Sequence, residues 1–133
     1  MSENLDLVRS IFASYGRGDY SSTEWAHSDI EFVIADGPSP GRWTGLMGLE
    51  DAYRDLLTAW DDYRVEPVEY RELDDERVLV RLRRSGRGKR SGLELGQMQA
   101  EGANLLHVRD GQVTRVVVYF DRDHALADLG LKE

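Results

Sequence analysis

Residues 101–121 read EGANLLHVRDGQVTRVVVYFD and contain two strand patterns separated by a turn. The turn lies at residues 109–112, where the Asp-Gly pair is typical of a tight β-hairpin connection. Residues 113–120 after it are rich in β-branched side chains, which favour a strand. The stretch therefore predicts an antiparallel hairpin near the end of the chain.

The first strand of this hairpin extends backwards to residue 93. A run over residues 93–109 is long for one strand, so we expect it to bend or bulge at Gly96 or Gly102. Residues 81–90, just before it, carry six basic side chains around a glycine-rich tip. We interpret them as a solvated hairpin whose charges oppose edge pairing, with an anion-docking patch as the alternative.

Two more strand patterns precede the basic segment. Residues 78–84 alternate valine or leucine with arginine, as in a strand with one buried face. Residues 65–73 form the neighbouring pattern, in which Pro67 indicates an edge strand or a bulge. The second half of the chain is therefore predicted to be a sheet built from hairpins.

Helical spacing marks two runs in the first half, one ended by Gly16 and Gly18 and a longer one that forms an unbroken apolar face. The first comprises Leu5, Val8, Ile11, Phe12 and Tyr15, and the second comprises Leu49, Ala52, Tyr53, Leu56, Leu57 and Trp60. Because Trp60 ends the second face, we expect it to be buried between this helix and the sheet. A terminal helix is predicted from its N-cap Asp121 through Leu129.

Shorter elements are predicted between the two helical runs. Ser21 or the serine after it can cap a short helix whose inward residue is Trp25. Residues 30–35 form an apolar run that reads as a strand. Residues 36–41 hold two prolines and two glycines, which excludes regular structure, and residues 42–45 are expected to continue as a loop.

Helices followed by hairpins indicate an α+β fold, an antiparallel sheet with helices on one face. The 133 residues fit a single domain over residues 1–133. A net charge of −8 opposes binding to nucleic acid, and no apolar run reaches membrane-spanning length. The absence of cysteine excludes disulfides and zinc–thiolate sites, and we expect a cytoplasmic protein. Neither a metal nor a cofactor is expected, because the three histidines are scattered and no phosphate-binding glycine loop occurs.

The order of five short segments resembles the nuclear-transport-factor-2-like superfamily and, within it, the SnoaL-like domains. The segments are IFASYGRGD at 11–19, DIEF at 29–32, WTG at 43–45, RDGQV at 109–113 and YFD at 119–121. The resemblance implies a cone-shaped α+β barrel, in which helices close the concave face of a strongly curved antiparallel or mixed sheet over a pocket. It also implies that the convex face forms homodimers, as in many relatives.

The superfamily holds both enzymes and non-catalytic proteins, so the resemblance does not fix a reaction. Matched to ketosteroid isomerase, the tyrosine that donates to the oxyanion falls at Ile11 and the basic aspartate falls near Ile34. The second acid of that enzyme falls near Asn104. Because isoleucine can neither donate a hydrogen bond nor carry a proton, the usual isomerase chemistry is not expected.

Three other polar residues are the candidate catalytic set: Asp36, Tyr53 and Asn104. For Asp36 the alternative is a turn residue before Gly37, and for Tyr53 it is a core aromatic whose hydroxyl is hydrogen-bonded. Asn104 is either a hydrogen-bond partner of a substrate or a satisfied core amide.

The predicted ligand pocket combines inward positions of the helices and strands, with strand parity taken from the resemblance. Its lining is Phe12, Tyr15, Trp25, Phe32, Ile34, Tyr53, Asn104, Leu106, Val116, Val118 and Phe120. No cation is expected to point inward, so the pocket suits a small hydrophobic, ring-containing molecule and not a phosphorylated metabolite. The favoured function is binding of such a molecule. A cofactor-independent isomerase, cyclase, dehydratase or epoxide hydrolase is the first alternative, and a structural dimerisation module with a filled pocket is the second.

A homodimer is expected through the convex face of the sheet. Leu105, His107, Val117 and Tyr119 share the strand parity that faces away from the pocket. So many apolar groups would not be left in water, which is why a second copy is predicted to cover them.

Overall fold

The computed structural model describes residues 3–19, 23–36, 40–88 and 97–131. Side chains of residues 56, 59–62, 87–88 and 97–100 lie outside this description. In chain order the elements are α1 (Glu3–Gly16), β1 (Ala26–Ile34), β2 (Gly41–Thr44), α2 (Gly45–Ala59), β3 (Trp60–Glu72), β4 (Arg77–Gly88), β5 (Gln97–Arg109), β6 (Gln112–Tyr119) and α3 (Arg122–Leu129). No helix within these ranges has the length and hydropathy needed to span a bilayer.

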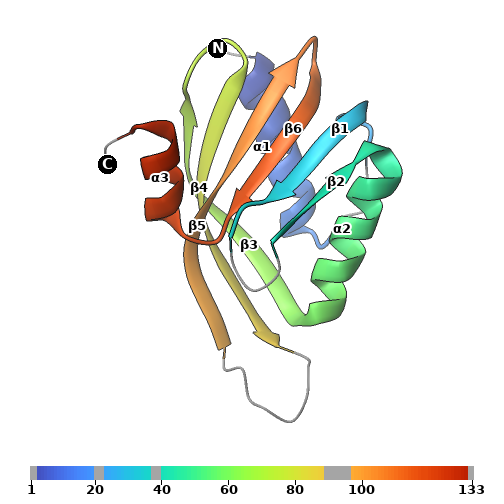
Figure 1. Ribbon diagram of the computed structural model, residues 1–133, viewed down its shortest axis with the longest axis vertical. Helices are drawn as coiled ribbons and strands as arrows, with labels where there is room; N and C mark the ends of the chain where they lie inside the picture. Colours follow the sequence, from blue (N-terminus) through green and yellow to red (C-terminus); the bar gives the residue numbers. More distant parts are fainter. Residues whose placement is uncertain (1–2, 20–22, 37–39, 89–96, 132–133) are drawn as a thin grey trace.

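The six strands form one mixed sheet in the order β2-β1-β6-β5-β4-β3. β1 runs parallel to β6, and every other neighbouring pair is antiparallel. The sheet is curved and does not close on itself (Figure 1). The expected α+β fold with a curved, mixed sheet is therefore confirmed.

The concave face of the sheet carries the larger core. α1 contributes Val8, Ile11 and Phe12, and α2 contributes Leu49, Ala52 and Tyr53. From the sheet, the core residues include Val78, Val80, Leu82, Leu106, Val108, Val116 and Val118, which alternate along three neighbouring strands. The predicted strand parity thus holds, since these side chains all point toward the two helices.

α3 covers the opposite face, although all helices were expected on one side. Ala125 and Leu126 of α3 pack against Leu105, Val117 and Tyr119 in a second core. The reason is visible in β5 and β6, where consecutive residues are apolar, so both faces of these strands need cover. The caps of α3 are as predicted: the Asp121 side chain accepts a hydrogen bond from the Asp123 backbone N–H, and Gly130 is left-handed with φ 65°.

Two segments in the first half differ from expectation. Residues 42–44 are not a loop but belong to β2, which pairs with β1 so that Trp43 lies opposite Phe32. This pairing provides hydrogen-bond partners for backbone N–H and C=O groups of the segment at the edge of the sheet. The short helix around Trp25 is also wrong for the described residues 23–25, because they form a turn and β1 begins at Ala26. The serines at 21 and 22 lie outside the described residues.

The remaining strand predictions have mixed outcomes. A register shift between Pro67 and Glu69 confirms the bulge expected in β3. Gly102 shows no bulge against β4, since it pairs in register with Leu82. Trp60 begins β3 instead of ending α2, and its side chain lies outside the described residues, as does Gly96. The sequence did not predict a strand over residues 60–64, because the helical spacing of apolar residues that begins at Leu49 continues to Trp60.

Candidate functional site

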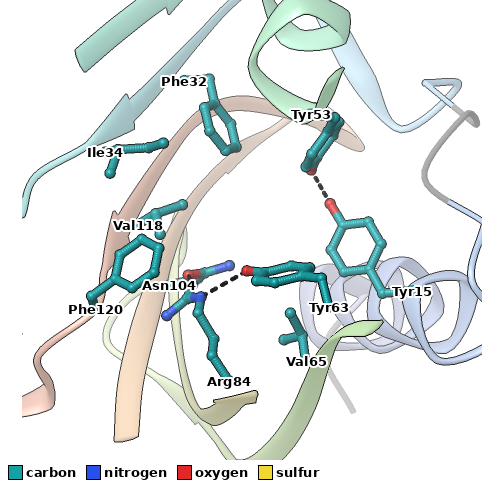
Figure 2. Close-up of a pocket in the computed structure, with 10 residues that line it drawn as sticks. All are labelled: Tyr15, Phe32, Ile34, Tyr53, Tyr63, Val65, Arg84, Asn104, Val118 and Phe120. Carbon is teal, nitrogen blue, oxygen red and sulfur yellow. Dashed lines mark hydrogen bonds between the residues drawn. The ribbon is translucent and has the colours of Figure 1, made fainter. Parts of the chain in front are cut away.

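A small cavity lies on the concave side of the sheet, between the sheet and the helices α1 and α2 (Figure 2). Its walls are Tyr15, Phe32, Ile34, Tyr53, Tyr63, Val65, Arg84, Asn104, Val118 and Phe120. The free space is about 20 Å³, which holds one or two water molecules. Tyr15, Tyr63 and Phe120 are partly exposed, so the cavity meets solvent at aromatic side chains.

Strand register explains why the sheet side of the cavity has this lining. Ile34 pairs with Val118 across β1 and β6, and Val118 pairs with Asn104 across β6 and β5. The three side chains form one row across the concave face, because paired residues point to the same side of a sheet. Asn104 is 8% exposed, so its amide is a polar group within an otherwise apolar row.

Tyr15 of α1 and Tyr53 of α2 meet above this row. Their hydroxyls hydrogen-bond to each other (Figure 2). Their rings pack edge to face at 5.8 Å, and Phe32 packs against Tyr53 in the same way at 5.4 Å. One hydroxyl of the pair donates and the other accepts.

Arg84 of β4 is the most unusual residue of the site, with an exposed fraction of 1%. Its Nε donates to the Tyr63 hydroxyl at 3.1 Å, and its Nη1 donates to the Tyr119 carbonyl at 2.9 Å. Its Nη2 donates to the side-chain oxygen of Asn104. The guanidinium also lies over the Phe120 ring, 4.8 Å from the ring centre. Within the described part of the chain, this cation is therefore held by uncharged groups.

Gly102 provides the space that Arg84 needs. A Cβ atom at this position would lie closer than 3.0 Å to both the Tyr119 carbonyl oxygen and Arg84 Nη1. The absent side chain lets the guanidinium cross β5 and reach the backbone of β6. A glycine that was expected to bend the strand instead clears a path for a buried arginine.

No carboxylate lines the cavity within the described part of the chain. Asp36, the candidate acid, accepts a hydrogen bond from the Phe120 backbone N–H at 2.5 Å, and its other oxygen lies 2.7 Å from His124 Nδ1. This contact raises the pKa of His124 above its usual value, and the Asp128 carboxylate adds to the shift. Asp36 therefore joins the end of β1 to β6 and α3.

Comparison with known proteins places the chain in a family. The family model described as a SnoaL-like domain matches residues 8–116. The chain belongs to the SnoaL-like domain family. No curated protein sequence matches it.

Solved structures similar to this SnoaL-like protein share its fold at low sequence identity. TerC, co-crystallised with polyporic acid, is 23% identical with a TM-score of 0.75, and the match covers 96% of this chain and 98% of TerC. A nuclear-transport-factor-2-like protein of unknown function from Burkholderia pseudomallei is 20% identical with a TM-score of 0.78, covering 96% and 97% of the two chains. A suspected polyketide cyclase from Xanthomonas campestris is 20% identical with a TM-score of 0.75, covering 94% and 95%.

Seven residues of the predicted lining do border the cavity of the SnoaL-like domain: Tyr15, Phe32, Ile34, Tyr53, Asn104, Val118 and Phe120. The other four, Phe12, Trp25, Leu106 and Val116, are buried in the surrounding core. Tyr53 and Asn104 of the candidate catalytic set thus share one cavity, whereas Asp36 lies behind it.

Three lining residues were missed: Tyr63, Val65 and Arg84. The expectation that no cation points inward is wrong, because Arg84 does. The signal was present in the sequence, since Arg84 continues the inward series of Val80 and Leu82 at a spacing of two. It was overlooked because a run of arginines was interpreted as a solvated hairpin.

The histidine predicted to lie away from the pocket does so. His107 is half-buried, and its strand partner on β6 is Arg115. Burial lowers the pKa of His107, and the positive charges of Arg115 and Arg77 lower it further. Across the described residues, no group of three or more acidic or histidine side chains could hold a metal ion.

Proposed function

We propose that this SnoaL-like protein binds a small, ring-containing organic molecule in the cavity under α1 and α2, without transforming it. The observation that carries the proposal is the chemistry of the described lining, which is aromatic and aliphatic except for a few hydrogen-bond donors. Such a lining binds by desolvating an apolar ligand and orients it through a few polar contacts. TerC, which has the same fold, was co-crystallised with polyporic acid, and this supports the proposal by analogy.

Binding is favoured over catalysis because the lining offers no general base. An isomerase, cyclase, dehydratase or epoxide hydrolase without a cofactor needs a group that takes up a proton near neutral pH. The described lining provides tyrosine hydroxyls, an amide and a guanidinium, and none of these is basic at neutral pH. Asp36, the remaining acid of the candidate set, is held by Phe120 and His124.

The size of the cavity sets a condition on binding. Pockets for organic ligands usually enclose about 300–1,000 Å³, so the free space of about 20 Å³ must grow when a ring enters. We expect Tyr63 and Phe120 to move aside, since both are partly exposed and neither belongs to the helix–helix contact. The ring of the ligand then lies against Ile34 and Val118 on the sheet side of the cavity.

A pair of neighbouring valines tests the location of the site. Val118 lines the cavity, whereas Val117 faces α3 on the other side of the same strand. Val118→Leu should weaken binding of ring compounds such as naphthalene-2-methanol at least about fivefold, because the added methylene fills free space that a ligand needs. Val117→Leu adds the same volume and should leave the affinity, measured by calorimetry, unchanged. Equal effects of the two substitutions, or no effect of either, would contradict the proposed site.

A further inference from the structure

The charge of the buried Arg84 is balanced differently from that of seven more exposed arginines in the described part of the chain. Seven arginines have a carboxylate oxygen within 4.0 Å: Arg42, Arg54, Arg77, Arg81, Arg83, Arg115 and Arg122. Arg84 is more deeply buried than any of them and has no such partner among the described residues. Among the described residues, the most buried cation of this acidic chain therefore has no carboxylate beside it.

The donors of Arg84 are only partly used. A guanidinium has five N–H groups, and the three contacts to Tyr63, Tyr119 and Asn104 use three of them. One N–H on each terminal nitrogen therefore has no acceptor among the described residues. Since these nitrogens belong to a residue that lines the cavity, a molecule inside it can accept from them (Figure 2).

Arg84 also fixes the orientation of the neighbouring amide. A guanidinium only donates, so the oxygen of Asn104 must face it and the Asn104 amide nitrogen must point elsewhere. This NH₂ group has no hydrogen-bond partner among the described residues, although the side chain is 8% exposed. Arg84 and Asn104 together present donors, and the described lining contains no carboxylate to balance the guanidinium.

We propose that the ligand of this cavity is an organic monoanion whose carboxylate or acidic enol oxygen is bound by Arg84 and Asn104. Burying a charge is costly unless an opposite charge accompanies it, and a ligand anion supplies that charge where the protein does not. The inference rests on the proposed function, because it names the chemical class of the molecule for the same cavity.

The rest of the lining separates this class from inorganic anions and phosphate esters. Phe32, Ile34 and Val65 form apolar walls around the donor group, and Arg84 is the single cation of the described lining. One guanidinium balances one negative charge, whereas a phosphate dianion would keep a second charge against apolar side chains. In a planar ring compound with one acidic group, the ring fits the apolar side chains and the acidic group fits the guanidinium.

The test compares benzoate with benzamide, which has the same size and shape but no charge. At neutral pH and constant ionic strength, calorimetry on the wild-type protein should give a dissociation constant at least about tenfold lower for benzoate, because hydrogen bonds to a charged group are the stronger kind. Arg84→Gln should remove this preference, and Arg84→Lys should restore part of it. Arg83→Gln removes the same charge from the exposed face of the same strand and should keep the full preference.

The outcomes separate the inference from the proposed function. Equal affinities for benzoate and benzamide, or tighter binding of benzamide, would overturn the anion assignment while leaving a ring-binding cavity in place. If Arg83→Gln also loses the preference for benzoate, the preference comes from the net charge of the protein. That result would overturn the anion assignment as well. If neither compound, nor naphthalene-2-methanol, binds the folded wild-type protein at millimolar concentration, the proposed function itself fails. The wild-type comparison decides the question even if Arg84→Gln does not fold.

Discussion

At the scale of single residues, the site depends on one glycine that leaves room for the guanidinium of one arginine. The inward position of Arg84 follows from the alternation that also places Val80 and Leu82, so the sequence contains enough information to predict it. What the sequence could not predict is that the guanidinium crosses β5 to the carbonyl of Tyr119. That path depends on the register between three strands, which no local pattern encodes.

Gly102→Ala tests this arrangement. The new Cβ would collide with the Tyr119 carbonyl oxygen and with Arg84 Nη1, so either the strand or the guanidinium must shift. We expect the free energy of unfolding, measured with urea, to fall by about 1–3 kcal/mol, and benzoate binding to weaken with it. Gly16→Ala is the matched control, because its Cβ would meet no atom within 4 Å. A Gly102→Ala protein as stable as the control would contradict the proposed packing.

At the scale of elements, α3 is the part that sequence patterns placed incorrectly. Its caps and length were predictable because Asp121 and Gly130 are local signals, but the face it covers depends on the whole sheet. β2 was missed for a similar reason, since a four-residue edge strand next to a proline-rich segment has too little pattern of its own. Long, strongly periodic elements such as α1 and β6 were predicted correctly.

The contact between α3 and β1 should respond to pH. The Asp36 carboxylate raises the pKa of His124 above its usual value of 6.5, so the folded protein binds this proton more tightly than the unfolded chain. The resulting stabilisation is complete below about pH 6.5 and is lost as the pH rises through the folded-state pKa. The stability difference between wild type and His124→Gln should therefore be larger at about pH 5.5 than at about pH 8.5. A difference that grows with pH would show that the ion pair does not form.

Packing of α3 should also contribute to stability. Leu126 is 7% exposed and lies in the second core with Leu105 and Val117. Leu126→Ala should lower the free energy of unfolding by about 2–4 kcal/mol, as expected for a truncated core leucine. Leu129 at the end of α3 is only partly buried and provides the control. Leu129→Ala should lower the free energy of unfolding by less than Leu126→Ala does. If both substitutions lower the free energy of unfolding by the same small amount, α3 is not firmly packed against the sheet.

At the scale of the whole molecule, the fold was predictable from the order of its segments, whereas the surface that meets a partner was not. The homodimer was predicted because Leu105, Val117 and Tyr119 share the convex parity, yet α3 leaves these side chains only 4–6% exposed within one chain. The homodimer stays a prediction, but these three residues no longer provide the reason for it. Sedimentation at micromolar concentration should give twice the chain mass of 15.1 kDa, and a 15.1 kDa species alone would contradict it.

An acidic ring compound should bind at Arg84 in the cavity under α1 and α2. A crystal structure of the protein soaked with 4-bromobenzoate is the decisive measurement, because anomalous scattering from bromine locates the ring directly. We expect the carboxylate to lie within hydrogen-bond distance of Arg84 and Asn104, with the bromine displaced toward the partly exposed Tyr63 and Phe120. A cavity that holds only water, with bromine bound elsewhere or nowhere, would contradict it.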